Sequence, residues 1–311
     1  MLYVPTNFFC TLPRLSRLIW NMAESASLHA RPELHNARAG RRKHLDIQYE
    51  NDPIKKVKGP SPIARKKRVE KVQKQHVDKG EKPSWEPKNW HLQLQNIREM
   101  RKAKDAPVDT MGCSELSDRS ESVEVQRYQI LISLMLSSQT KDQITAAAMH
   151  RLKNHGLTMD NVMATSDKQL GELIFPVGFW QRKVQYIKRT TAMLIEKYNK
   201  DIPPTLDELK ALPGIGPKMA HLIMLSAWNS VVGIGVDTHV HRISNRLKWV
   251  KKPTTDPEKT RIALEEWLPR NEWREINCLM VGFGQTICLP INPLCDNCLN
   301  KPICPYGKRG R

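Results

Sequence analysis

Four cysteines lie close together near the C-terminal end of this 311-residue chain. They follow the pattern Cys288-x6-Cys295-x2-Cys298-x5-Cys304, so four thiolates fall within 17 residues. A structural zinc site usually uses two close Cys-x2-Cys pairs, whereas only one close pair occurs here. Unequal loops around four thiolates are better suited to a cubane iron–sulfur cluster, so the spacing favours a 4Fe-4S cluster over zinc. A small secreted disulfide scaffold is excluded, because its cysteines would be spread along a shorter chain.

A glycine-rich turn is the second chemical feature. Residues 212–220 read Leu-Pro-Gly-Ile-Gly-Pro-Lys-Met-Ala, and a helix over about 206–211 is expected to lead into the turn. Pro217 would open a second helix. Gly214 and Gly216 allow positive φ values and a close approach of the backbone to a ligand. The N–H groups of the turn would then form a phosphate site. An ordinary helix–helix turn accounts for the same residues equally well.

Lys218 lies in the first turn of that second helix. A cation is unfavourable there, because the helix dipole stabilises anions at a helix N-terminus. The same dipole favours the neutral amine, which is the nucleophilic form. Lys218 is therefore a candidate nucleophile, and a lysine that only contacts phosphate is the alternative.

Asp237 supplies a carboxylate within the segment Val-Asp-Thr-His-Val-His-Arg at 236–242. A helical pattern follows it, so Asp237 is expected to cap that helix, and capping alone would account for an aspartate here. Its neighbours His239, His241, Arg242 and Arg246 are suited to a surface that faces DNA. This neighbourhood favours a role in chemistry as well.

The elements that position these residues are predicted to be helical from about residue 120 onward. Apolar residues recur at three- and four-residue steps over 128–135 and 184–194, the period of one helix face. Glycine and proline signals separate the helices, and Asp256-Pro257 predicts the start of another one. The segment 231–236 is the only candidate strand. The sequence therefore predicts an all-α fold of many short helices.

The chain is strongly basic, with 50 Lys+Arg against 32 Asp+Glu and a formal net charge of +18. This balance favours a polyanionic partner, most commonly nucleic acid, although histone-like binders that are not enzymes share it. Hydrophobic residues make up 40% of the chain, enough for a substantial core. No apolar run approaches the roughly 18 residues of a membrane-spanning helix, so no membrane association is expected.

The N-terminal third carries the densest charge, and periodic apolar faces are hard to find there. Its first thirty residues place Arg14 and Arg17 among apolar side chains. Such a start is typical of a mitochondrial transit peptide, with a plain disordered tail as the alternative. Translation from Met22 would remove that segment.

Three basic clusters follow in the same part of the chain. They are typical of nuclear import signals or phosphate-binding arms, and a solvated basic linker is the alternative. Together with the transit-like start, they predict both nuclear and mitochondrial localisation. The clusters occupy residues 41–43, 55–58 and 65–68.

In this order, the three constellations resemble the endonuclease III family of DNA repair glycosylases. The Pro-Gly-Ile-Gly-Pro-Lys segment resembles the family's helix-hairpin-helix, Val-Asp-Thr-His its catalytic aspartate motif, and the cysteine spacing its cluster loop. The segments 136–142 (Leu-Ser-Ser-Gln-Thr-Lys-Asp) and 177–180 (Val-Gly-Phe-Trp), the latter followed by Lys183, also resemble family motifs. The resemblance covers about residues 120–304, and the basic extension is similar to that of eukaryotic members.

The resemblance implies a monomer with two helical lobes and an active-site cleft between them. One lobe would be a six-helix barrel, and the other would carry the iron–sulfur cluster. The implied domains are a largely disordered basic extension with targeting signals (1–100), the cluster lobe (101–119 and 232–304), the barrel (120–231, with the helix-hairpin-helix at 206–229) and a tail (305–311).

The resemblance also implies a bifunctional DNA glycosylase and AP lyase of base excision repair. Lys218 would be the nucleophile that forms a Schiff base, with Asp237 as its acid/base partner. Gln139 would fill the gap left by the extruded nucleotide, and Phe179 would wedge at the opposite strand, where the family often has an aliphatic residue. His239 and the glycines at 214 and 216 would contact DNA.

The implied substrates are double-stranded DNA with oxidised pyrimidines such as thymine glycol, and abasic sites. β-Elimination would cleave the strand on the 3′ side of the lesion. The basic extension would offer a contact for downstream repair proteins. The loop between Cys288 and Cys295 has no basic residue, although bacterial members use one there to touch DNA. That contact is therefore left to other residues, such as the N-terminal arm.

Three alternatives use only part of this evidence. A non-catalytic iron–sulfur DNA-binding scaffold leaves the pairing of Lys218 with Asp237 unexplained. An adenine-mispair glycosylase of the same superfamily usually lacks this lysine and adds a large C-terminal recognition domain. A ferredoxin-like electron carrier uses the cysteines alone.

Overall fold

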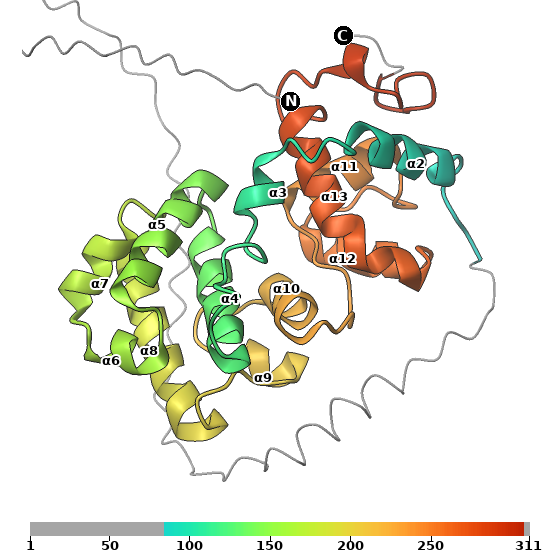
Figure 1. Cartoon of the computed structure of the whole chain (residues 1–311). Helices are drawn as coiled ribbons and strands as arrows, with labels where there is room; N and C mark the ends of the chain where they lie inside the picture. The colour runs from blue at the N-terminus through green and yellow to red at the C-terminus, as the bar shows by residue number, and fades with distance from the viewer. Residues whose placement is uncertain (1–83, 308–311) are drawn as a thin grey trace, which may run out of the picture. The chain divides into compact units, whose positions relative to one another are not determined.

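The computed structural model describes residues 84–307, and all the regular elements among them are helices (Figure 1). The predicted all-α class is thereby confirmed, and the candidate strand at 231–236 is irregular. The predicted transit-like segment, the basic clusters and Met22 lie outside the described residues. No helix in the described part is long and apolar enough to cross a membrane.

The described helices form two lobes, each with its own hydrophobic core. In the barrel lobe, α4 is buried on nearly every side from Tyr128 to Leu136, as expected of a central helix. Seven helices occur between residues 120 and 231 where six were expected, because short helices capped by Thr158, Ser166 and Thr205 separate the longer ones. The seven are α4 (Val123–Ser137), α5 (Asp142–His155), α6 (Met159–Ala164), α7 (Asp167–Ile174), α8 (Trp180–Tyr198), α9 (Leu206–Lys210) and α10 (Pro217–Trp228).

The second lobe contains the four clustered cysteines and a core rich in tryptophan. Trp267 packs edge-on against Trp90 and Trp249, with ring centroids 5.2 and 5.7 Å apart. As predicted, a helix starts after Asp256, which caps it. The elements are α2 (Trp90–Met100), α3 (Pro107–Met111), α11 (Thr238–Leu247), α12 (Pro257–Glu265), η1 (Arg270–Glu272), α13 (Trp273–Thr286) and η2 (Cys295–Asn297).

The folded part begins earlier than the predicted domain boundary at residue 100. Trp90, Leu94 and Ile97 of α2 are buried in the core of the cluster lobe. These three residues follow helical spacing, but exposed polar neighbours obscure the pattern in the sequence. Segment 101–119 also differs from the expectation, because Leu116 belongs to the core of the barrel lobe. This segment therefore runs from one lobe to the other.

A second crossing between the lobes lies at residues 231–236. Glu265 of α12 accepts a hydrogen bond from the backbone N–H of Ile234 at 2.7 Å. Val232 packs against the barrel core, whereas Ile234 and Val236 are buried in the core of the cluster lobe. The chain thus changes lobes immediately before Asp237.

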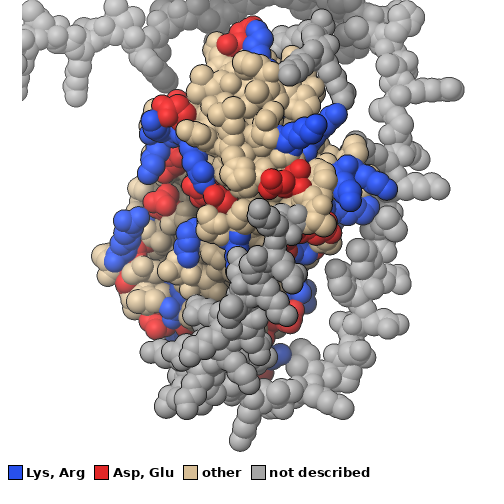
Figure 2. Space-filling model, turned by 90° about the vertical axis from the view of Figure 1, so that its right-hand side faces the viewer, with Lys and Arg blue, Asp and Glu red and all other residues tan. Residues whose placement is uncertain are grey.

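The described residues are close to charge balance, with 29 Lys+Arg against 24 Asp+Glu. On the face shown in Figure 2, basic and acidic side chains are interspersed. Most of the net positive charge of the chain therefore belongs to residues outside the described part.

Candidate functional site

A cleft of about 990 Å³ is lined by residues of both lobes. Its size is at the upper end of the range of small-molecule sites, roughly 300–1,000 Å³. Of the predicted site residues outside the cysteine cluster, only Phe179 does not line this cleft. The residues that do line it are Gln139, Gly214, Gly216, Lys218, Asp237 and His239.

The glycine-rich turn joins α9 to α10, as predicted. Gly214 has a φ of 80°, and a Cβ atom there would lie 3.0 Å from the ring of Tyr186. Gly216 differs from the prediction, because its φ of −94° is accessible to any residue. Its distinguishing property is open space, since no atom lies within 4 Å of an added Cβ. Gly214 is required by the backbone conformation, whereas Gly216 leaves room for a ligand.

The N-terminus of α10 is open toward the cleft. Pro217 takes its first position, no side chain caps it and its first turn holds no acidic residue. The N–H groups of this turn are therefore available to an anion such as a phosphate. Lys218 lies in the same turn, is exposed and lines the cleft.

Asp237 caps α11, so that prediction is confirmed. Its Oδ1 accepts a hydrogen bond from the N–H of Val240 at 2.8 Å. The cap needs only this oxygen, and Oδ2 accepts no hydrogen bond from the described residues. The carboxylate can therefore cap the helix and still offer an oxygen to a ligand in the cleft.

His239 follows on α11 and contacts Arg242, with 3.2 Å between Nδ1 and the guanidinium. Burial lowers the pKa of His239, and the negative charge of Asp237 raises this pKa by a smaller amount. Because His239 lines the cleft as a largely neutral ring, it can accept or donate one hydrogen bond to a ligand there.

His241, Arg242 and Arg246 do not line the cleft, contrary to the sequence-based expectation. The Nδ1 of His241 lies 2.7 Å from the hydroxyl oxygen of Thr260 on α12. Arg242 donates to the carbonyl of Cys288 at 2.9 Å. Arg246 donates to the carbonyls of Leu289 and Pro290 at 2.7 and 2.8 Å. Both arginines hold the start of the cysteine loop, a role that no local pattern in the sequence indicates.

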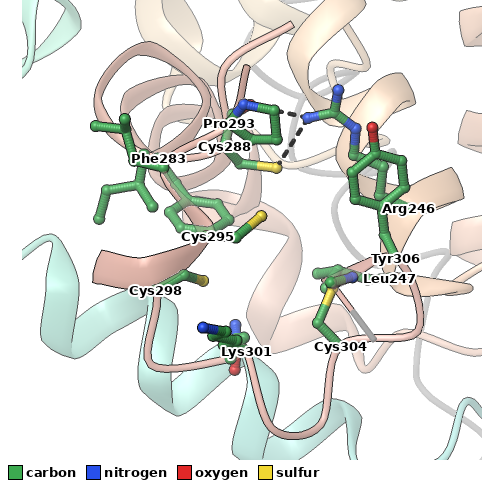
Figure 3. Close-up of a pocket in the computed structure, with 14 residues that line it drawn as sticks. Arg246, Leu247, Phe283, Cys288, Pro293, Cys295, Cys298, Lys301, Cys304 and Tyr306 are labelled. Atoms are coloured by element: carbon green, nitrogen blue, oxygen red, sulfur yellow. Dashed lines mark hydrogen bonds between the residues drawn. The ribbon is translucent and has the colours of Figure 1, made fainter. Parts of the chain in front are cut away.

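The four clustered cysteines line one pocket, and their sulfur atoms face a common space in Figure 3. None of the four forms a disulfide, and Arg246 lies 3.3 Å from the sulfur of Cys288. Within residues 84–307, no group of three or more His, Cys, Asp or Glu side chains forms a ready site for a single metal ion. Four thiols around one pocket walled by Phe283 and Pro293 nevertheless fit the donor chemistry of an iron–sulfur cluster.

Gln139 and Phe179 occupy two exposed loop positions, with φ values of 52° and 55°. Gln139 lines the cleft, and Phe179 directly precedes α8 with 61% of its surface exposed. Lys183 lies one turn into α8 and is buried, which lowers its pKa to about 8. The Val-Gly-Phe-Trp segment that precedes this lysine in the sequence indicated no role for it.

Other cleft residues were also missed, because each comes from a segment without a local motif. Gln285 of α13 donates to the carboxylate of Asp142 at 2.7 Å and accepts from the N–H of Val108 at 3.1 Å. These bonds link the two lobes at the edge of the cleft. Cys113 also lines the cleft, and burial raises the pKa of its thiol.

Known proteins similar to this chain share its sequence over most of the described part. The family profile described as HhH-GPD superfamily base excision DNA repair protein matches residues 132–270. Endonuclease III-like protein 1 of Gallus gallus is 64% identical over 227 residues, which cover 73% of this chain and 81% of the relative. Endonuclease III-like protein 1 of Bos taurus is 56% identical over 261 residues, covering 81% of this chain and 86% of the relative.

Two solved structures share the fold with 29% sequence identity and a TM-score of 0.59. One is described as a trapped endonuclease III–DNA covalent intermediate, an estranged-adenine complex, and the other as a non-covalent endonuclease III–DNA complex. The similarity covers 70% of this chain, and 95% and 94% of those chains.

Proposed function

Because the chain belongs to the endonuclease III family, within the HhH-GPD superfamily of base excision DNA repair proteins, we propose that this DNA glycosylase is also an AP lyase. Its proposed substrates are double-stranded DNA with oxidised pyrimidines of the thymine glycol type, and abasic sites. The observation that carries the proposal is that Lys218 and Asp237, from different lobes, line one cleft.

A base inside a duplex is out of reach of Lys218, so the damaged nucleotide must be extruded into the cleft. The volume of about 990 Å³ accommodates a nucleotide. Gln139 would fill the gap in the lesion strand, and Phe179 would wedge at the opposite strand. The exposed positions of both side chains support these roles.

The helix-hairpin-helix would hold the DNA backbone. The uncapped first turn of α10 borders the cleft, and the space beside Gly216 would let a phosphate approach the N–H groups of this turn. His239 would add a contact from the other lobe. Binding on both sides of the cleft would keep the sugar of the extruded nucleotide near Lys218.

In the proposed reaction, the neutral amine of Lys218 attacks C1′ of the sugar and the bond to the base breaks. The base leaves with the bonding electrons and takes up a proton. Asp237 would stabilise the cationic sugar and accept a proton from the attacking nitrogen. The sugar ring then opens to the Schiff base. Loss of a C2′ proton expels the 3′ phosphate, and water finally hydrolyses the imine to release Lys218.

Cys288, Cys295, Cys298 and Cys304 are proposed to hold a 4Fe-4S cluster, which would fasten the C-terminal loop to its lobe. Four thiolate ligands leave no position for substrate, so no catalytic step is assigned to the cluster. Arg242 and Arg246 support this arrangement, because they hold the loop where it leaves α13.

We further propose that the protein acts as a monomer in the nucleus and the mitochondrion. Its basic N-terminal extension would contact downstream repair proteins. Two chains that begin at Met1 and Met22, each fused to a fluorescent protein, would test the localisation. Loss of the mitochondrial signal from the shorter chain is expected. An identical distribution of the two chains would contradict the transit-peptide assignment.

Borohydride trapping tests the enzymatic proposal. The unmodified protein is incubated with a thymine glycol duplex and borohydride, beside Lys218→Gln and the control Lys210→Gln. Lys210 is a suitable control because it lies on α9 in the same motif and pairs with Asp207 at 2.9 Å. Covalent bands from the unmodified protein and the control alone would support the proposal.

Trapping by Lys218→Gln would show that another residue is the nucleophile. No band from any of the three, with tight salt-sensitive DNA binding, would refute the enzyme in favour of a non-catalytic iron–sulfur scaffold.

A further inference from the structure

Gln139 and Phe179 share an unusual backbone conformation. Both take positive φ values, 52° and 55°, although neither is glycine. Such conformations are strained for residues with a Cβ atom and persist where surrounding contacts enforce them. The two residues are 40 positions apart in the sequence, so the contacts that join their loops are informative.

Lys183 supplies the central contacts. Its side chain is 6% exposed, and its Nζ donates to the carbonyls of Leu136 and Ser138 at 2.6 Å each. These carbonyls lie at the C-terminal end of α4, where the helix leaves acceptors without partners and favours a cation. Among the described residues, the hydrogen-bond acceptors of Lys183 are all neutral oxygens, and the third is Thr140 Oγ1 at 3.3 Å. The ammonium group therefore holds two backbone carbonyls that precede Gln139 and the hydroxyl oxygen of the residue that follows it.

Thr140 connects this loop to the loop that carries Phe179. Its hydroxyl oxygen accepts from the N–H of Gly178 at 3.1 Å and also lies within reach of Lys183. The backbones are in direct contact, since a Cβ atom on Gly178 would lie 2.6 Å from the carbonyl oxygen of Gln139. The two loops are thus one packed unit, with the buried lysine beneath it.

We propose that Lys183, Thr140 and Gly178 form a loop clamp that sets the spacing between Gln139 and Phe179 before DNA binds. Lys183 is accordingly a positioning residue for nucleotide extrusion, although it touches neither DNA nor the reacting atoms. This inference rests on the proposed function, in which both side chains enter the opened duplex. A preset spacing avoids ordering two loops at the moment when the duplex is unstacked.

The clamp predicts that its loss impairs extrusion more than the chemistry of Lys218. The variant Lys183→Met keeps the length of the side chain and removes its donors. Excision from a thymine glycol duplex under single-turnover conditions is expected to fall by about 10²-fold, the typical effect of a displacement of about 1 Å. Cleavage of an abasic site in single-stranded DNA, which has no base pair to open, should change by less than about threefold.

Lys188→Met is the matched control. Lys188 lies on the same helix, and its Nζ also donates to backbone carbonyls, those of Met163 and Thr165, away from the cleft. It should retain activity on both substrates. Thr140→Val, which removes only a hydroxyl group, is the second clamp variant and should show the same selective loss if Lys183→Met fails to fold.

A 2-aminopurine base opposite the lesion supplies a readout that is independent of catalysis. Its fluorescence should rise when the unmodified protein or Lys188→Met binds, because the opposite strand is unstacked, and should rise less with the clamp variants. The clamp would be overturned if the clamp variants lost equal activity on the duplex and the single-stranded substrate. It would also be overturned if their fluorescence rise equalled that of the unmodified protein. If the unmodified protein excised nothing and trapped no imine, the proposed function itself would fail, and the clamp with it.

Discussion

His221 is expected to make the stability of the protein sensitive to mild acid. It lies on α10, one turn after Lys218, and its side chain is 5% exposed. Its Nδ1 has no hydrogen-bond partner among the described residues, and a Cβ atom on Gly233 would lie 2.5 Å from its ring. The ring therefore fills the space beneath the crossing between the lobes.

The direction of this pH dependence follows from the difference in the pKa of His221 between the folded and the unfolded chain. Burial lowers the pKa of His221 from 6.5 to about 4, and Arg261 acts in the same direction. Between these values the unfolded chain binds a proton that the folded chain does not, so the free energy of unfolding falls as the pH falls. At about 1.4 kcal/mol per pKa unit, the upper limit is about 3 kcal/mol. Partial solvation of the ring edge reduces this, so a loss of about 1–2 kcal/mol is expected between pH 7.5 and 5.0.

Urea unfolding followed by circular dichroism at these two pH values measures the effect. The variant His221→Gln retains a polar side chain but does not titrate. Its free energy of unfolding should therefore fall on acidification by about 1–2 kcal/mol less than that of the unmodified protein. His150→Gln, at an exposed position of α5, controls for the substitution itself and should behave as the unmodified protein. The same pH dependence in His221→Gln and the unmodified protein would refute the reasoning.

Three further substitutions test the supports of the two sites. Gln93→Leu leaves the buried indole N–H of Trp249 without its acceptor, 2.6 Å away, so urea unfolding should show a loss of about 1–3 kcal/mol; an unchanged midpoint would contradict this. Gly284→Ala would place a Cβ atom 2.5 Å from Nδ1 of His239, and single-turnover excision should slow while the far-ultraviolet spectrum stays the same. Arg246→Leu removes the donors that hold the cysteine loop, so a chelator should strip iron faster than from the unmodified protein; an equal rate would show that the loop holds itself.

The parts of the site that could be predicted from sequence depend on contacts within a few residues. Asp237 caps the helix that begins directly after it, and Pro217 opens the helix that carries Lys218. The positive φ of Gly214 is likewise a property of a tight turn. Such features need no knowledge of the rest of the fold, so residue type and spacing were sufficient.

The features that were missed depend on partners far away in the chain. Arg242 and Arg246 were expected at a DNA-facing surface because of their neighbours in sequence, but backbone carbonyls more than 40 residues away bind them. The folded stretch 90–100 was assigned to the extension because nothing near it in the sequence indicates a core. Its apolar residues find their partners in α11 to α13, more than 130 residues away. Charge and composition carry no information about such distant partners.

For Lys183, however, the helical spacing of the sequence does indicate a distant partner. Ile187 and Leu194, which defined the apolar face of α8, lie four and eleven residues after it, so the lysine falls on that same face. A lysine on a buried face must find oxygen partners, since an unpaired ammonium group is too costly to bury. The C-terminal end of a helix supplies such oxygens, because its last four carbonyls have no partner within the helix. A charged residue in register with an apolar helix face therefore predicts a contact with another helix end, and here that contact lies beneath Gln139.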